Sequence, residues 1–483
     1  MALKRKFQNK EDNLDDVEDL EDLEDLVWDE FDENELDSDV NSHLDSDADN
    51  KSEHSNVDLT QCKALLDSIK NISINNIKIL TNLVKAVVIE QKTVINSPTL
   101  KCNKSINKKI VSMTCNYQIT EQSSDYIINW LTDNLPSLLN KTCRHKSGSS
   151  LNYSEWKNKK KPFETFLYYF RMIVLMFKSD PCILQFITFF ESISLHLANI
   201  DNEIFGKYLC FITYHWSCSN SMDIRNCCDS LLTKLLNYCP NRTNSMILKS
   251  LRKNFIINCK FYTTESKKYV EFMHNSFVNL CIKDVEETYS LCFNLLKNLA
   301  TLARNVTDAK NKNNTKSFQF YLSLKFVTYV ICKYLKNEEK LNTLIQPLIE
   351  VIICVIKINS SNVSCLYRFK CIRLLIYISK ETKIFIPILD YILETLELVN
   401  TDNTTNKSKI STNLGDVRFK LTISNSLVHD KSHHDIIFTS SISMLCEYLL
   451  IYANSVAFPE LCYRCVIKGV TLIKESKAIS IKS

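Results

Sequence analysis

A cysteine pair near the end of the chain has the spacing of a metal site. Cys462 and Cys465 form a C-x-x-C motif, and His433-His434 could supply two further ligands. A structural zinc ion usually takes four such ligands, often from two paired motifs. The two cysteines, however, lie three residues apart beside Val466, which places them on one apolar helix face. We therefore interpret them as buried core residues and expect no bound metal.

Catalysis and nucleotide binding are disfavoured by a shortage of glycine. The chain has 483 residues but only four glycines, where the average usage of about 7% would give roughly 34. Phosphate-binding loops and nucleophile turns rely on glycine because it adopts positive φ without strain, and neither motif occurs here. His196 and His215 lie in apolar segments and are interpreted as core histidines. We predict no catalytic residue, no cofactor and no enzymatic activity.

A basic segment with interleaved aromatic residues is the candidate for nucleic-acid contact. Tyr153 and Trp156 lie among its cations, and cations bind phosphate while aromatic rings stack on unpaired bases. The run 157–161 fits a nuclear import signal or a solvated surface equally well, and no RNA-binding module signature accompanies it. The candidate RNA or import-signal contacts are Arg144, Lys146, Lys157, Lys159, Lys160 and Lys161.

The charge of the chain is divided between an acidic tail and a basic body. Residues 1–58 hold 22 of the 55 acidic residues and only five basic ones. The remainder carries 54 basic and 33 acidic residues, a net charge of +21. We predict that the tail is disordered, because its apolar residues are sparse; it could also fold as a short helix on a basic partner. The basic body indicates contact with a polyanion, or with the tail as an intramolecular mimic of one.

Cysteine usage and apolar runs indicate the compartment. The twenty cysteines are scattered among apolar residues, and the N-terminal residues lack the apolar core of a signal peptide. We therefore expect a reduced intracellular protein that uses cysteine as a small hydrophobic residue. Charged residues such as Arg171 and Glu350 interrupt the longest apolar runs. None reaches the roughly 18 apolar residues of a membrane span, so we predict no membrane contact.

Helical periodicity dominates the chain from residue 59 onward. Asp284 is expected to cap a helix whose apolar face continues from Cys292 to Ala303. Pro347 is expected to split or kink a helix over 341–356. The alternating run 417–423 is the one strand candidate. Further predicted helices cover residues 74–95, 122–139, 364–380, 386–399, 435–453 and 459–475.

The spacing of these helices predicts an all-α fold. Helices of 12 to 20 residues in antiparallel pairs give a period of about 40 residues, which is typical of HEAT and armadillo repeats. We therefore expect a HEAT/armadillo-like α-solenoid, with a compact irregular bundle as the alternative. The predicted divisions are a disordered acidic tail over 1–58, N-terminal helices with basic polar loops over 59–161, and a helical-repeat domain over 162–477, with a polar insert at about 400–434.

Five short motifs resemble one known family in their order along the chain. The first is Asn258-Cys259-Lys260-Phe261 within 251–263, which is followed by a Met-His-Asn-Ser step within 272–276. The remaining four are Gln346-Pro347-Leu348-Ile349 with Val351-Ile352, the helix 367–374, Phe385-Ile386-Pro387-Ile388, and 454–461. Because the motifs occur in this order, the chain resembles the nucleolar complex protein 2 family over about 165–475.

The resemblance implies a function and partners. It implies a non-enzymatic α-helical scaffold of the nucleus, nucleolus and nucleoplasm. Its role would be the maturation and intranuclear transport of large ribosomal subunit precursors. The implied partners are nucleolar complex proteins 1 and 3 and the pre-ribosomal particle, with contact to rRNA. The alternative function is a chromatin regulator whose acidic tail binds histones or other basic proteins.

Two arginines in the third motif, the helix 367–374, are candidate structural or partner-binding residues. Arg368 and Arg373 lie five residues apart on an otherwise apolar helix. A buried arginine must be paired, because an unpaired charge in a protein core is costly. Pairing with Asp or Glu of a neighbouring helix is one interpretation, and contact with a partner protein is the other.

Overall fold

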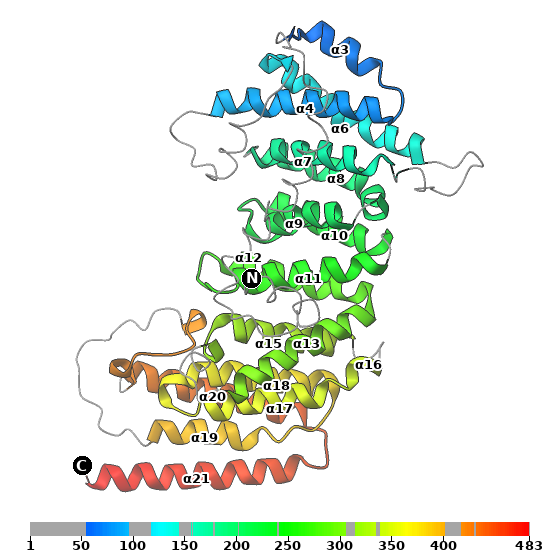
Figure 1. Ribbon diagram of the computed structural model, residues 1–483. Helices are drawn as coiled ribbons and strands as arrows, with labels where there is room; N and C mark the ends of the chain where they lie inside the picture. Colours follow the sequence, from blue (N-terminus) through cyan, green and yellow to red (C-terminus); the bar gives the residue numbers. More distant parts are fainter. Residues whose placement is uncertain are drawn as a thin grey trace, which may run out of the picture. The chain divides into compact units, whose positions relative to one another are not determined.

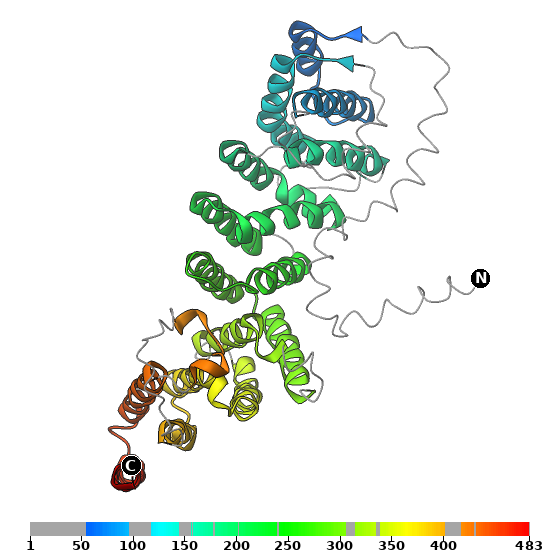
Figure 2. The same cartoon turned by 90° about the vertical axis from the view of Figure 1, so that its left-hand side faces the viewer.

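The structure is a computed structural model of the 483-residue chain, shown in two views in Figures 1 and 2. It describes residues 55–95, 117–143, 156, 158–176, 179–200, 202–238, 241–305, 314–334, 339–400, 417–428 and 431–482. Helices account for most of these residues, so the predicted all-α class is confirmed. The chain divides into two compact units, Asp29–Asn254 and a second one from Phe255 to Ser483.

The described part of the first unit begins with a small parallel pairing. Strand β1 (Ser55–Asn56) pairs with β2 (Tyr117–Gln118), and the sequence did not predict either strand. The helices that follow are α3 (Leu59–Asp67), α4 (Ile74–Ile95), α6 (Glu121–Cys143), α7 (Lys160–Met176), α8 (Asp180–Ile200), α9 (Asn202–Cys218), α10 (Met222–Tyr238) and most of α11 (Asn241–Asn258).

Packing in this unit connects helices that are close in sequence. Helix α4 packs on α6 and α7, α6 packs on α8, and α8 packs on α9 and α10, which Figure 1 shows as successive layers. Apolar residues recur on α8 at helical spacing, so one side of the helix is buried. There Phe190 stacks on Tyr208 of α9 with ring centroids 5.6 Å apart, and the Tyr208 hydroxyl donates to the Leu167 carbonyl at 3.1 Å.

The second unit contains the remaining helices. They are α12 (Lys267–Leu280), η2 (Cys281–Lys283), α13 (Val285–Arg304), α15 (Phe318–Tyr334), α16 (Glu339–Asn342), α17 (Ile345–Ile358), η3 (Asn362–Ser364), α18 (Cys365–Thr382), α19 (Leu389–Asn400), η4 (Val417–Phe419), η5 (Asn425–Leu427), α20 (Lys431–Ile451) and α21 (Phe458–Lys482). Helix α18 packs on α15, α17 and α20, and α19 packs on α20 and α21.

Local signals in this unit give two confirmed predictions. The Asp284 carboxylate caps α13 by accepting from the Glu287 amide at 3.1 Å, and the predicted apolar face of α13 is buried. The predicted split of 341–356 is also present, because α16 ends at Asn342 and α17 begins at Ile345. Pro347 lies in the first turn of α17, where its missing N–H breaks no helical hydrogen bond.

The strand predicted over 417–423 is wrong. Val417–Phe419 form a 3₁₀ turn, and Leu421 and Ile423 beyond it are buried. The Leu421 carbonyl accepts from the amide of Tyr367 at 3.1 Å, and the Ile423 amide donates to the Val363 carbonyl at 2.9 Å. The first amides of a helix have no partner within the helix. This segment therefore bonds to the start of α18 and does not join a strand.

Three described stretches, the second of which runs from α16 through the turn at 343–344 into α17, are long and apolar enough to cross a membrane by length and composition alone. They are Asp180–Ile200, Lys340–Ile358 and Ser432–Ile451. Uninterrupted apolar runs in the sequence do not identify these segments, because each contains a few polar or charged residues. About half of each of the first two segments is buried inside the protein, against 28% of the third.

Candidate functional site

The predicted basic segment is only partly described by the structure. Lys160 and Lys161 are exposed in the first turn of α7, Lys159 is half-buried, and Lys160 lies 3.7 Å from the Glu164 carboxylate. Trp156 is buried, and its ring meets Phe163 edge-on with centroids 5.0 Å apart. Its predicted stacking on nucleic-acid bases is therefore wrong, since it belongs to the core.

Three of the predicted contacts lie outside the described residues: Arg144, Lys146 and Lys157. A role of the whole basic segment in RNA contact or nuclear import thus stays a prediction.

The C-x-x-C pair lies on a helix that is only partly covered. Cys462 and Cys465 of α21 are both half-buried, and neighbouring Val466 is 62% exposed. The interpretation of this face as fully buried core is therefore wrong for Val466, because α21 has packing partners on one side only. Among the described residues, no group of three or more His, Cys, Asp or Glu could hold a metal ion.

The two histidines interpreted as core residues, His196 and His215, are buried to different degrees. His196 is buried, and its Nε2 lies 3.1 Å from Asn140 Oδ1. His215 is half-buried with its ring 4.4 Å from that of Phe211. Burial lowers the pKa of His215 to about 4, although Asp180 opposes the shift. Burial also lowers the pKa of His196, so both rings are neutral at pH 7.

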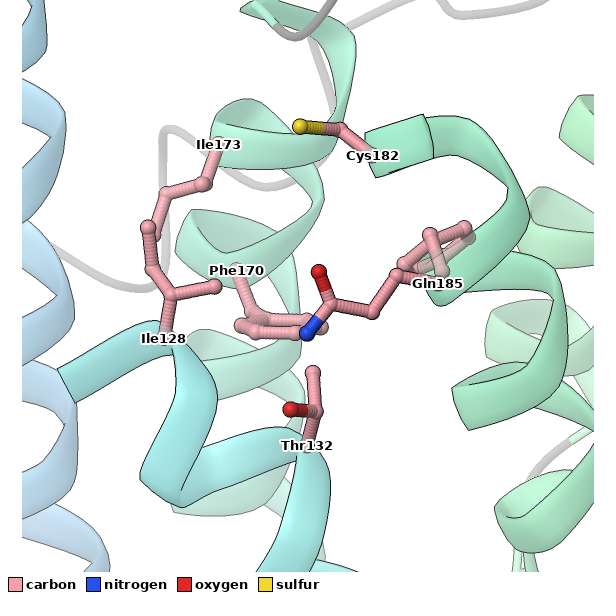
Figure 3. Close-up of a pocket in the computed structure, with 7 residues that line it drawn as sticks. Ile128, Thr132, Phe170, Ile173, Cys182 and Gln185 are labelled. Carbon is pink, nitrogen blue, oxygen red and sulfur yellow. The ribbon is translucent and has the colours of Figure 1, made fainter. Parts of the chain in front are cut away.

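A small apolar pocket lies between α6, α7 and α8 (Figure 3). The Gln185 side chain at its edge donates to Asn129 Oδ1 at 3.1 Å. Its apolar walls and few polar groups offer little for substrate recognition. The lining residues are Ile128, Thr132, Phe170, Ile173, Cys182, Gln185 and Phe186.

The two candidate arginines on α18 have different environments. Arg368 is buried, and its Nη2 forms an ion pair with the Glu394 carboxylate of α19 and donates to the Tyr391 carbonyl at 3.3 Å. This contact is of the kind predicted, between a core arginine and an acid of a neighbouring helix. Arg373 is exposed, so five residues of separation place the two side chains on different sides of the helix.

Cations and aromatic rings from four parts of the second unit form a connected patch, which we call the basic-aromatic surface. The four parts are the turn after α11, helices α15 and α18, and η4. Figures 1 and 2 show η4 in orange beside α15. Its members are all half-buried or exposed: Lys260, Phe261, Tyr262, Phe318, Tyr321, Lys325, Tyr329, Lys370, Arg373, Tyr377, Arg418 and Phe419.

Tyr262 fixes the turn after α11. Its ring centroid lies 5.3 Å from that of Phe318 on α15 and 5.3 Å from that of Phe419 in η4. The preceding Cys259 is fully buried. With both sides of the turn held, Phe261 is left 67% exposed, and Lys260 Nζ lies 5.7 Å from its ring.

Lys370 links α18 to η4 and α15. Its Nζ donates to the Arg418 carbonyl at 2.9 Å and lies 5.8 Å from the ring centroid of Tyr321. The Arg418 guanidinium is exposed and lies 5.9 Å from the Phe419 ring. These distances are within the range of cation–π attraction, so the cations and rings hold one another in place.

The far end of the surface is a tyrosine stack. Tyr329 of α15 and Tyr377 of α18 have ring centroids 4.5 Å apart and planes inclined by 13°. Lys325 Nζ lies 5.4 Å from the Tyr329 ring, and buried His274 meets that ring edge-on at 5.0 Å. Offset stacking of this kind is a favoured aromatic geometry.

The electrostatics of the surface are predominantly positive. Burial lowers the pKa of Lys325, and Glu271 partly restores it. Burial, with Cys332 and Glu381 nearby, raises the pKa of Tyr377 to about 12. The tyrosine is therefore uncharged at pH 7. The carboxylates of Glu271 and Glu381 add negative charge near Lys325 and Tyr377. Glu271 also lies 3.7 Å from Lys267.

A second surface consists of exposed apolar residues on the last two helices. On α20 they occur every four residues, and on α21 they occur at i, i+3, i+4, i+7 and i+10, so each set forms a stripe along its helix. The members are Phe438, Ile442, Cys446 and Leu450 on α20, and Tyr463, Val466, Ile467, Val470 and Ile473 on α21. We call these the C-terminal apolar stripes.

Sequence reasoning missed the basic-aromatic surface. Its signal is present in α15, where Phe318, Tyr321, Lys325 and Tyr329 follow helical spacing, but the same pattern is typical of a half-buried helix face. The other parts lie some 50 to 100 residues away along the chain. Only packing brings them together.

An all-α chain with a basic-aromatic surface and exposed apolar stripes has the features of a binding protein, since contiguous exposed patches mark interaction sites. A comparison with family models narrows this class. The model of the Noc2p family matches residues 242–483, half of the chain, and the chain belongs to that family. The resemblance seen in the sequence motifs is thereby confirmed.

Relatives from several eukaryotes agree with this membership. An uncharacterised NOC2 family protein of Schizosaccharomyces pombe is 27% identical over 54% of this chain. Nucleolar complex protein 2 of Drosophila melanogaster is 26% identical over 48% of the chain. Nucleolar complex-associated protein 2 of Arabidopsis thaliana is 25% identical, also over 48%.

The matched regions cover 38%, 30% and 30% of the lengths of these three proteins. The chain thus spans about a third of the curated relatives it matches. Their names support the predicted location: the chain is a nuclear, nucleolar protein.

Proposed function

We propose that the chain is a non-enzymatic scaffold in ribosome biogenesis. It would act in nuclear maturation of large ribosomal subunit precursors and in their transport through the nucleoplasm. Membership of the Noc2p family supports this role, as do the nucleolar names of two relatives. The family match favours ribosome biogenesis over the chromatin and histone-binding alternative.

The observation that carries the scaffold function is the pair of C-terminal apolar stripes. Val466 is 62% exposed and Leu450 is 73% exposed. Exposure of rows of apolar side chains to water is unfavourable. Burial of each such side chain against a partner would stabilise the complex by about 1.5–3 kcal/mol. A helix with an exposed apolar stripe binds well in a groove of a helical partner. The partners proposed by resemblance are nucleolar complex proteins 1 and 3.

The finer architecture belongs to the same proposal. Within each unit, helices close in sequence pack together, which supports a HEAT/armadillo-like arrangement of antiparallel pairs. Such arrangements present long surfaces to partners. The acidic segment 1–58, which lies outside the residues that we describe except for its last four, is proposed to be disordered and to contact basic partners.

Affinity purification from nuclei tests the scaffold function. The tagged chain should recover large-subunit precursors together with nucleolar complex proteins 1 and 3. The variant Val466→Glu/Val470→Glu should lower partner recovery at least tenfold, because two carboxylates would be buried in the interface. Phe293→Glu is the control, since Phe293 is exposed to a similar degree on α13. Full recovery of the partners by the double variant would show that the stripes are not the partner-binding surface. If the parent chain recovered no large-subunit precursor, the proposed function would be rejected.

A further inference from the structure

We propose that the basic-aromatic surface binds single-stranded RNA. The inference deepens the proposed function, since the RNA met by a ribosome-assembly scaffold is precursor rRNA. It does not depend on the partner proteins, however, because the surface is built entirely from residues 260–419 of this chain. A base of an unpaired strand would stack on the exposed ring of Phe261, with the half-buried rings beside it, and the phosphates would bind the neighbouring cations.

The interleaving of rings and cations is the reason for choosing RNA as ligand. Phe261 is the most exposed ring and has Lys260 beside it. On the other side of the Tyr262 ring, Arg418 lies next to the ring of Phe419, and Lys370 lies next to the ring of Tyr321. Successive nucleotides present a base and a phosphate in alternation, so a surface that alternates rings and cations matches them. Proteins that bind single strands combine the same two elements.

The geometry favours an unpaired strand over a duplex. In A-form RNA the bases are stacked on each other, and their faces are closed to side chains. The ring of Phe261 is 67% exposed on a turn held by Tyr262, whereas Tyr329 and Tyr377 cover each other's faces at 4.5 Å. A ring contributes through stacking only when a base is free to meet its face. A duplex would engage the cations alone.

An acidic protein segment is the competing ligand, because carboxylates also bind cations. Its aspartate and glutamate side chains would not need the exposed ring of Phe261, since they carry no aromatic ring to stack on it. The tail of this chain, with 22 acidic residues within 1–58, is the acidic ligand most readily available. It therefore serves as the comparison ligand in the test.

Fluorescence anisotropy with the purified full chain tests the proposal. The probes are a fluorescein-labelled 20-nucleotide RNA of mixed sequence, the same RNA annealed to its complement, and a labelled peptide of residues 11–27, which is acidic and contains no aromatic residue. Phe261→Ala should weaken single-strand binding at least fivefold, the lower end of what one stacked base contributes, and leave duplex binding unchanged. Tyr463→Ala is the matched control, because Tyr463 on α21 is also 67% exposed. Circular dichroism melts check that each variant folds.

A salt titration tests the cations separately. The variant Arg373→Gln/Arg418→Gln should reduce the slope of log affinity against log salt by about 1.4, since each phosphate contact in a single strand contributes about 0.7. Lys340→Gln is the control, because Lys340 is exposed on α16 and pairs with Glu286 at 2.6 Å. An unchanged slope in the double variant would count against the assignment.

Three outcomes would overturn the inference. They are single-strand binding that survives Phe261→Ala, tighter binding of the duplex than of the single strand, and binding of the acidic peptide in place of RNA. Because the partner purification uses a different surface, its result is independent. If the parent chain recovered neither precursors nor partners but still bound single-stranded RNA, the scaffold function would be rejected and this inference retained.

Discussion

Arg368 places a positive charge in the core of the second unit. Its side chain is 3% exposed, whereas its partner Glu394 on α19 is 54% exposed. A buried ion pair is stabilising only when both charges are compensated. Here water reaches the carboxylate, so Glu394 tolerates loss of its partner better than Arg368 does. The arrangement indicates a packing role that joins α18 to α19.

This asymmetry predicts different costs for two substitutions. Glu394→Gln should lower the free energy of unfolding by about 1–2 kcal/mol, a value discounted for solvent screening of the exposed acid. Arg368→Met should cost less, because the remaining carboxylate is hydrated. Urea unfolding midpoints give the comparison. Arg373→Gln, on the exposed side of α18, should stay within about 0.5 kcal/mol of the parent; a larger loss there would assign Arg373 a structural role.

His274 predicts how stability depends on pH. It is buried beside Tyr329 and Phe255. Burial is the main reason that its pKa falls to about 4, and the Lys325 charge adds to the effect. The unfolded histidine titrates near its ordinary value of about 6.5. The folded state therefore binds fewer protons, and stability present above pH 6.5 is lost as the pH falls towards 4.

Between pH 7 and pH 5 this linkage should cost the parent protein about 2 kcal/mol. The variant His274→Asn should lose about that much less over the same interval, whatever its stability at pH 7. Unfolding curves recorded at several pH values measure the difference in slope. Parallel slopes for the two proteins would show that His274 does not titrate across this range.

At the scale of elements, the segment after η4 stabilises the start of α18. Leu421 is buried, and its carbonyl accepts from the Tyr367 amide at 3.1 Å. The same segment carries Arg418 and Phe419 of the basic-aromatic surface. Anchoring by Leu421 and Ile423 thus positions two side chains of the candidate site.

Leu421→Ala should release this segment locally. Loss of a buried leucine costs about 2–5 kcal/mol, so exchange of the Tyr367 amide should accelerate at least tenfold. Hydrogen exchange read out by mass spectrometry or NMR measures the effect. Thr422→Ala, at the exposed position between the two anchors, should leave the rate unchanged. Equal acceleration in both variants would refute the anchoring role.

At the scale of the whole molecule, the boundary between the units falls inside a helix. The second unit begins at Phe255, whereas α11 runs from Asn241 to Asn258. Phe255 is buried, and the carbonyl of Ile256 accepts from Gln319 Nε2 at 3.1 Å. The last turn of α11 thus belongs to the core of the second unit, and the family match begins near the start of this helix, at residue 242.

A fragment of residues 240–483 should therefore fold by itself and show one cooperative thermal transition. A fragment of residues 255–483 should be markedly less stable, because an isolated turn of helix is marginal in water. Circular dichroism melts of the two fragments provide the measurement. Equal melting temperatures would mean that the first turns of α11 contribute nothing to this unit.

The sequence by itself determined the class of fold and many of its elements. Glycine scarcity is a property of composition and helical periodicity a local one, and together they predicted an all-α chain. They also predicted α4 over 74–95 and the Asp284 cap. The order of short motifs predicted the family, which the family match confirms. The periodicity, the cap and each motif depend on residues that are near one another in the chain, and composition and motif order can be read along it without knowledge of packing.

Tertiary structure alone decided which residues share a surface. Trp156, expected to stack on bases, is in the core because Phe163 packs on it, and Val466 is exposed because α21 has neighbours on one side. The basic-aromatic surface joins residues as far apart as Lys260 and Arg418. Whether a half-apolar helix face is covered depends on distant helices, and no local pattern contains that information.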